Sequence, residues 1–166
     1  DVRQWVLVSS FEPLRVHIFS SCYLRLCNAP YDLGDLGNRQ RHVSNWEVNK
    51  HGRNAVEGAV AQLQDLRGVL SEISGQEDYW DAVTFPKVKE IVKNSLRAVQ
   101  PSIVQRASCF ELYGFDFLIG EDLQPWLLEV NLSPACEART SWVAAMSERM
   151  SERLLDLVLS GGLVPD

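Results

Sequence analysis

The sequence predicts an α+β domain in which an antiparallel sheet is flanked by helices. Residues 2–9 and 15–26 are rich in Val, Ile, Phe and Tyr and are joined by a short proline-containing segment, which favours two antiparallel strands. A second pair of strands is predicted at 110–119 and 126–131, because a polar turn with glycine and proline separates these two apolar stretches. Helical periodicity in three further segments supplies the flanking helices.

The three predicted helices differ in how clearly their ends are marked. Apolar residues recur at steps of three and four from 56 to 73, which predicts an amphipathic helix that ends near Gly75. A second helix is predicted over 86–99, where a proline in the first turn removes no hydrogen bond. The third is predicted over 141–159 and ends before the glycine pair at 161–162.

The segment 28–50 is polar and contains several Pro and Gly residues, so we expect it to be mostly loop. Just before it, the second strand is expected to run into a short helix near Tyr23. No internal repeat, low-complexity tract or linker interrupts the chain. These elements are therefore expected to belong to one unit.

Composition excludes several classes of protein. With 166 residues and 46% hydrophobic content, the chain can bury a core and is not intrinsically disordered. Its net charge of −6 argues against a partner nucleic acid, which would favour a basic surplus. No apolar run reaches the ~20 residues of a membrane span, so no membrane partner is expected. The four cysteines lack metal-ligand spacing and are interpreted as reduced thiols.

Charge is unevenly distributed along the chain. Residues 1–53 carry seven Lys/Arg and five Asp/Glu, which leaves nine basic and seventeen acidic residues in the remainder. An arginine-bearing face is one way to bind an anionic substrate, and carboxylates elsewhere can hold cations. Chance scatter of solvated charge explains the same counts.

Two carboxylates and an amide are predicted to share one face of the second hairpin. Alternate strand residues point the same way, so Glu129 and Asn131 lie on one face. If the hairpin loop has an even number of residues, with Gly120 opposite Pro125, then Asp116 pairs with Glu129. Such oxygen ligands suit Mg²⁺. Alternatively, the two acids face water or pair with arginines, and an odd loop would turn Asp116 to the wrong face.

Four blocks of sequence resemble the tubulin–tyrosine-ligase-like family, whose members are amino-acid ligases of ATP-grasp architecture, and the blocks occur in the same order as in that family. They are DVRQWVLV (1–8), YLRLCNAPYDLGDL (23–36), RHVSNWEVNK (41–50) and CFELYGFDFLIGEDLQPWLLEVNLSP (109–134). In the third block, Val43 and Ser44 stand where the family usually has Leu and Thr. The likeness covers nearly the whole chain.

The resemblance implies roles for individual residues. Asp116, Glu129 and Asn131 would hold Mg²⁺ against the phosphates of ATP, and Asp1 would contact the nucleotide. Two arginines, Arg3 and Arg25, would engage the acceptor carboxylate, the incoming amino acid or the transferred phosphate. The same cleft would be lined by His42, Ser44 and Asn45.

The activity implied by the resemblance is an ATP-dependent ligation. ATP would phosphorylate a glutamate side chain of a tubulin tail, and the amine of a free amino acid would attack the acyl phosphate. The segments GEDLQPWL and DVRQWVLV resemble glycine-adding members, whereas EVNLSP is more similar to glutamate-adding ones, so glycine is favoured. Acidic tubulin tails, microtubules and a free amino acid are the implied partners. The implied location is cytoplasmic, on the cytoskeleton or a cilium or flagellum.

The family places its phosphate-binding lysines and adenine pocket upstream of the first block. We therefore expect residues 1–162 to be the C-terminal portion of an ATP-grasp-like catalytic domain without its N-terminal lobe, followed by a tail at 163–166. Such a fragment is expected to be inactive alone. Two alternatives stay open: a non-catalytic module that binds tubulin or microtubules, and an ATP-grasp ligase that acts on another substrate.

Overall fold

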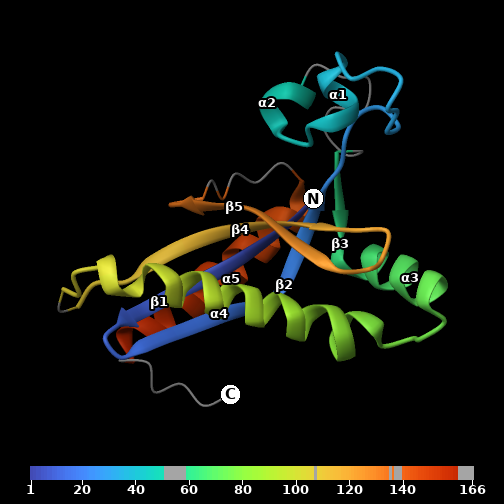
Figure 1. The fold of residues 1–166 in the computed structure, drawn as a ribbon. Coiled ribbons are helices and arrows are strands. Elements are labelled where there is room, and N and C mark those ends of the chain that lie inside the picture. Colours follow the sequence, from blue (N-terminus) through green and yellow to red (C-terminus); the bar gives the residue numbers. More distant parts are fainter. Residues whose placement is uncertain (51–58, 107, 135, 137–139, 161–166) are drawn as a thin grey trace.

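The computed structural model describes residues 1–50, 59–106, 108–134, 136 and 140–160. Within these ranges the chain forms one five-stranded sheet with helices on both faces (Figure 1). The expected tail at 163–166 and the glycine pair at 161–162 lie outside the described residues, as does the first part of the helix predicted from residue 56. The predicted α+β class with an antiparallel sheet is confirmed.

The strand order in the sheet is β3-β2-β1-β4-β5, and every neighbouring pair is antiparallel. Both predicted hairpins are present: β1 (Val2–Phe11) pairs with β2 (Leu14–Arg25), and β4 (Glu111–Ile119) pairs with β5 (Pro125–Leu132). The predicted short helix near Tyr23 is wrong. Strand β2 continues through Arg25, because residues 23–25 pair with the short strand β3 (Val60–Gln62).

The first predicted helix begins later than expected. Helix α3 (Leu63–Ser74) starts only after β3, so Val60 lies in a strand although its spacing fits the helical pattern. A capping box fixes this start: Gln62 accepts a hydrogen bond from the backbone of Asp65, whose side chain accepts one from the backbone N–H of Gln62. The predicted end is confirmed, since Gly75 adopts the left-handed conformation that terminates helices.

The other two predicted helices are confirmed. Helix α4 (Phe85–Val99) follows a π-helical turn (Trp80–Thr84) and ends at a 3₁₀ turn (Gln100–Ser102). Helix α5 (Ser141–Leu159) begins where the Thr140 hydroxyl accepts a hydrogen bond from a first-turn N–H. Among the described residues, no helix is long and apolar enough to cross a membrane.

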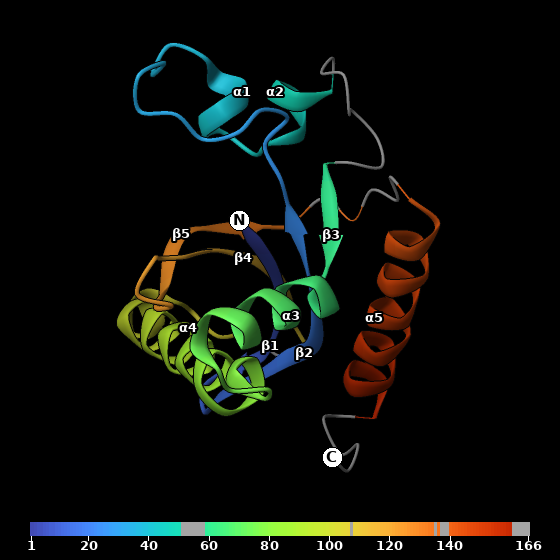
Figure 2. The same ribbon diagram turned by 90° about the vertical axis from the view of Figure 1, so that its right-hand side faces the viewer.

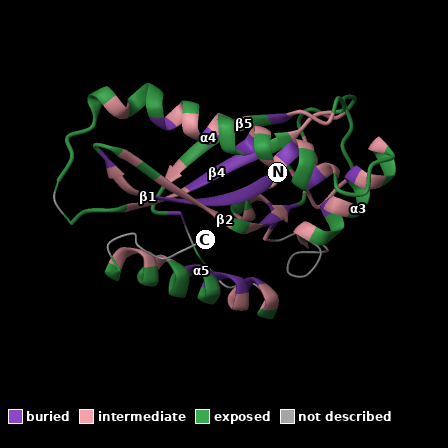
Figure 3. Ribbon diagram, turned by 90° about the horizontal axis from the view of Figure 1, so that it is seen from below, coloured by how far each residue is buried: buried purple, intermediate pink, exposed green. Residues whose placement is uncertain are grey.

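The sheet separates two apolar layers (Figure 2). Helices α3 and α4 cover one face, where Val6, Phe115 and Phe117 are fully buried between the strands and the helices. On the opposite face, α5 covers a smaller cluster around Trp5 (Figure 3). Successive residues of each strand point alternately into these two layers. The part of the second face that α5 does not cover carries polar residues.

The segment predicted to be mostly loop forms a small lobe above that polar area (Figure 1). It contains two one-turn helices, α1 (Arg39–His42) and α2 (Trp46–Asn49). The side chain of Asn49 is completely buried and donates hydrogen bonds to the carbonyl oxygens of Val43 and Asn45, at 2.6 and 3.0 Å. It also accepts one from the backbone N–H of Asn28. Such side-chain bonds to the backbone order a segment that has little apolar core.

Candidate functional site

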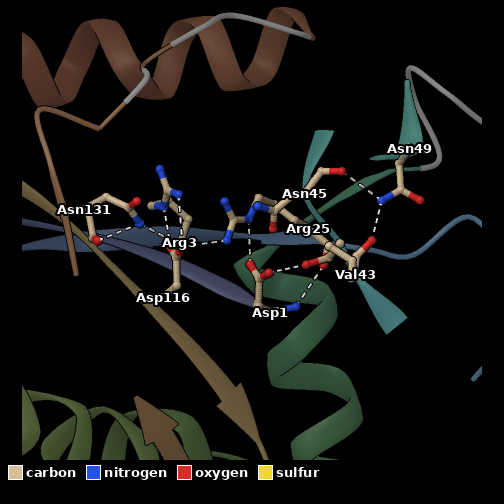
Figure 4. A network of polar contacts seen from close by, with 10 residues as sticks. Asp1, Arg3, Arg25, Val43, Asn45, Asn49, Asp116 and Asn131 are labelled. Carbon is tan, nitrogen blue, oxygen red and sulfur yellow. Dashed lines mark hydrogen bonds and ion pairs between the residues drawn. The ribbon is translucent and has the colours of Figure 1, made fainter. Parts of the chain in front are cut away.

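Neighbouring strands bring the predicted arginines and Asp116 together. Arg3 of β1 lies directly opposite Asp116 of β4, and the backbone of Arg25 in β2 pairs with that of Asp1. Directly opposed residues of an antiparallel pair share a face and lie within about 5 Å. Arg3 of β1 therefore lies beside Asp116, and Asp1, the residue just before β1, lies beside Arg25 (Figure 4).

The carboxylate of Asp116 receives hydrogen bonds from three side chains. Arg3 donates through Nε to Oδ1 at 2.5 Å and through Nη2 to Oδ2 at 3.1 Å. Arg25 Nη2 donates to Oδ2 at 2.7 Å, and Asn131 Nδ2 donates to the same oxygen at 3.0 Å. All three charged side chains are buried, with exposed fractions of 1% for Asp116, 6% for Arg3 and 9% for Arg25.

The arginines decide the protonation state of Asp116. Burial alone raises the pKa of a carboxyl group, because it disfavours the charged form. Here the hydrogen bond and charge of Arg3, followed by the charge of Arg25 and a contact with Glu129, outweigh burial and hold the pKa of Asp116 below its usual value. The carboxylate is therefore ionised and neutralised by its neighbours, which is the arginine pairing that the sequence left open.

Asp1 connects this cluster to the small lobe. Arg25 Nε donates to Asp1 Oδ1 at 2.6 Å, so one guanidinium bridges Asp1 and Asp116. The hydroxyl of Ser44 donates a short hydrogen bond to the other oxygen of Asp1. Two residues that the sequence placed in one cleft, Asp1 and Ser44, are thus in direct contact.

His42 and Asn45 lie further along the lobe. His42 Nε2 is 2.9 Å from the carbonyl oxygen of Asp35, and the ring of His42 packs edge-on against Tyr31. Asn45 instead lines a cavity of about 360 Å³ beside Arg3 and Arg25. The structure therefore brings Asn45 to the arginines, whereas His42 is not among the residues that line this cavity.

The cavity combines groups suited to a carboxylate or a phosphate. Its walls come from β1 and β2, from the lobe, and from the end of β5 with the residues that follow it. The lining residues are Arg3, Tyr23, Arg25, Asn45, Trp46, Glu47 and 131–134. Guanidinium groups bind planar carboxylates and phosphates through paired N–H donors. Asn49, which sequence reasoning missed, supports this wall because its side chain holds the backbone of residues 43–45.

Asp116 pairs with Glu129 as expected, although the even loop that was the condition for this pairing is absent. Ile119 pairs with Pro125, so the turn has five residues, 120–124. An odd turn alone would place Asp116 opposite Leu128. A bulge at Leu128 compensates, because Phe117 pairs with Leu127 while Asp116 pairs with Glu129. One extra residue in the strand thus restores the shared face.

The three predicted metal ligands have different surroundings. Asp116 is buried, whereas Glu129 is exposed and Asn131 is partly buried on strand β5, at the edge of the sheet. Two carboxylates and an amide oxygen form a donor set that fits a hard cation such as Mg²⁺. Within the described part of the chain, no three His, Cys, Asp or Glu side chains converge on one point.

Gly114, which sequence reasoning also missed, provides space for Arg3. It lies two residues before Asp116 on β4, beside the side chain of Arg3. A Cβ atom at this position would lie 2.7 Å from Cβ of Pro134, 3.2 Å from Cδ of Arg3 and 3.3 Å from its Cζ. The absence of a side chain therefore lets Arg3 pass to Asp116.

Fold and site define an α+β domain with a buried arginine–carboxylate cluster beside an anion-sized cavity. The family model described as the tubulin-tyrosine ligase family matches residues 1–165. The chain is 40% identical to tubulin glycylase 3E of Tetrahymena thermophila, over 95% of this chain and 11% of that protein. It is 34% identical to tubulin monoglycylase TTLL3 of Danio rerio, over 96% of this chain and 21% of that protein.

The probable tubulin polyglutamylase TTLL2 of Homo sapiens is 31% identical, over 98% of this chain and 28% of that protein. The chain belongs to the tubulin–tyrosine ligase family, as its sequence blocks predicted. It spans less than a third of the length of these relatives.

Replacing Asp116 with Asn should reduce the free energy of unfolding by about 3–5 kcal/mol at pH 7, because buried Arg3 loses its counter-ion and buried Arg25 loses one of its two. The folded-state pKa of Asp116 is lowered, so its contribution is complete above the unfolded value of about 4 and is lost as pH falls further. The difference between wild type and D116N, measured by urea denaturation, should shrink below about pH 4. A constant difference from pH 7 to pH 3 would contradict this.

Replacing Gly114 with Ala should cost about 1–3 kcal/mol of unfolding free energy, because Arg3 and Pro134 must move. The control is Gly37→Ala, since a Cβ there would meet nothing within 4 Å, and its effect should stay within about 0.5 kcal/mol. Adding Pro134→Gly to Gly114→Ala removes only the shortest contact, so it should restore stability in part. Equal effects of the Gly114 and Gly37 variants would show that the close approach is unimportant.

Proposed function

We propose that the protein carrying this chain is an ATP-dependent ligase that forms an amide bond between an amino acid and glutamate side chains of tubulin tails. The observation that carries the proposal is the pair Arg3 and Arg25 at a cavity beside Asp116, Glu129 and Asn131. Membership of the family adds support, since the relatives are tubulin glycylases and polyglutamylases by name.

The proposed reaction requires little covalent help from the protein. A glutamate carboxylate of the acceptor attacks the terminal phosphoryl group of ATP, which forms the acyl phosphate and releases ADP. The amine of the amino acid then attacks the acyl carbon, and the amide bond forms with release of phosphate and a proton. Such transfers depend on positioning and on neutralising charge. Arg3 and Arg25 would orient the carboxylate and then the acyl phosphate, because both guanidinium groups line the cavity.

Asp116, Glu129 and Asn131 would hold Mg²⁺, which when bound supplies charge for the phosphate oxygens. Asp1, with Ser44 fixing its second oxygen, would lie toward the nucleotide. The remaining parts of an ATP-grasp architecture would come from other segments of the protein.

Glycine is the favoured amino acid. The relatives named glycylases include those at 40% and 37% identity, whereas the named human polyglutamylase is 31% identical. The turn segment GEDLQPWL also resembles the glycine-adding members. Glutamate is the second candidate, because the chain matches both groups over nearly its full length.

A non-catalytic module that binds tubulin or microtubules is the alternative. One observation favours it: Asp116 is already neutralised by two arginines, so the cluster is stable without a cation. A protein that only held acidic peptides would need the arginines but not Glu129, which is exposed at the edge of the sheet.

Replacing Glu129 with Gln in the full-length protein separates these functions. A ligase should lose at least about 100-fold in tubulin modification, because one charged ligand of the proposed cation is removed, and should bind Mn²⁺ more weakly in a nucleotide-free titration. Glu121→Gln, at an exposed position in the turn of the same hairpin, is the control and should retain activity. Unchanged modification in E129Q would refute the metal assignment.

Labelled amino acids identify the donor substrate. Full-length protein incubated with ATP, Mg²⁺ and tubulin should incorporate labelled glycine, with glutamate at least about tenfold slower. The bound label is measured after separating the tubulin chains. Incorporation of glutamate alone would overturn the preference for glycine, and incorporation of neither would favour the binding module.

A further inference from the structure

A cation that binds Asp116 would compete with Arg3 and Arg25 for the carboxylate, because its oxygens already accept hydrogen bonds from both arginines. Oδ2 already accepts three hydrogen bonds, from Arg3, Arg25 and Asn131, and Oδ1 accepts one from Arg3 Nε. A carboxylate offers about four acceptor positions in total. A cation bound at either oxygen would also lie beside two guanidinium groups of like charge, which it repels.

Both arginines also have access to a second binding position, the cavity beside Asp116. Both line the cavity beside Asp116, so a guanidinium that leaves the carboxylate can still face an anion there. Arg25 is held independently of Asp116, because its Nε donates to Asp1 Oδ1 at 2.6 Å while only Nη2 reaches Asp116. Asp1 is in turn fixed by Ser44. Arg25 can therefore exchange one partner while keeping the other.

The charges of the cluster favour joint binding. The side chains of Asp1, Arg3, Arg25, Asp116 and Glu129 contribute three negative and two positive charges. A divalent cation alone changes this balance from −1 to +1, and a carboxylate added in the cavity returns it to zero. Since the interior screens charge weakly, the two ligands should stabilise each other.

We propose that Asp116 exchanges its arginines for the divalent cation, and that the released guanidinium groups bind the acceptor carboxylate, so that cation and acidic peptide bind cooperatively. This inference rests on the proposed function, which supplies the cation site and the acceptor. It adds a regulatory property: each ligand raises the affinity for the other, as thermodynamic linkage requires of any coupled pair.

The test measures binding and needs no turnover. Nucleotide-free full-length protein is titrated with Mn²⁺, followed by electron paramagnetic resonance of the free ion, without and with a saturating tetraglutamate peptide. The peptide should tighten Mn²⁺ binding about tenfold, within the usual range of coupling between sites. The reciprocal titration, peptide into protein saturated with Mn²⁺, should give the same factor.

Replacing Arg25 with Lys tests the exchange itself. Lysine keeps the charge but cannot bridge Asp1 and Asp116 through two separate nitrogens, so the coupling factor should fall to about threefold or less. Arg3→Lys is the second variant, should R25K fail to fold. The control is Arg41→Lys, because the ion pairs of Arg41 are with exposed Asp32 and half-buried Asp35, away from Asp116, and the tenfold factor should persist.

The outcomes separate this inference from the proposed function. If Mn²⁺ and peptide both bind but neither affects the other, the exchange is wrong and the cation site stands. Coupling that is equally strong in R25K and R3K also overturns the exchange, because direct attraction between the ligands would then suffice. Absence of any Mn²⁺ binding that depends on Glu129 overturns the proposed cation site and the exchange together.

Discussion

The buried ion pairs of Asp116 are the interaction on which the rest of the site depends. A carboxylate with 1% exposure is tolerated only because Arg3 and Arg25 neutralise it. The same bonds fix the side chains of three strands relative to one another, and through Asp1 they reach the small lobe. Removing the carboxylate would therefore leave buried Arg3 without its counter-ion and Arg25 with Asp1 alone, while the apolar layers on either face would remain.

Much of this arrangement follows from sequence pattern. Alternation in β1, β4 and β5 predicts the two hairpins and places Glu129 and Asn131 on one face, because strand residues two apart share a face. The pairing of Asp116 with Glu129 also requires the bulge at Leu128, which alternation does not reveal. Periodicity predicts α4 and α5 with their ends. The start of α3 could not be predicted this way, since Val60 fits a helical and an extended pattern equally well. Val60 is extended because it pairs with β2, and the local sequence pattern does not reveal a contact between segments so far apart in the chain.

The sequence predicted which residues form the site better than it predicted the hydrogen bonds between them. Sequence blocks identified Arg3, Arg25, Asp116 and Asn131, all of which meet in the structure. They did not indicate that both arginines pair with Asp116, because this depends on how three strands align. Gly114 and Asn49 were missed for a related reason: one acts by lacking a side chain next to Arg3, and the other acts on backbone carbonyls of a loop.

The bulge at Leu128 has a consequence for how this hairpin can vary. The turn of five residues and the one-residue bulge cancel each other, so that Asp116 and Glu129 stay opposite. While Ile119 pairs with Pro125, an insertion or deletion within the turn leaves Asp116 opposite Glu129, whereas loss of the bulge would place Asp116 opposite Leu128. Length differences among related hairpins should therefore occur in the turn, and the bulge should be retained.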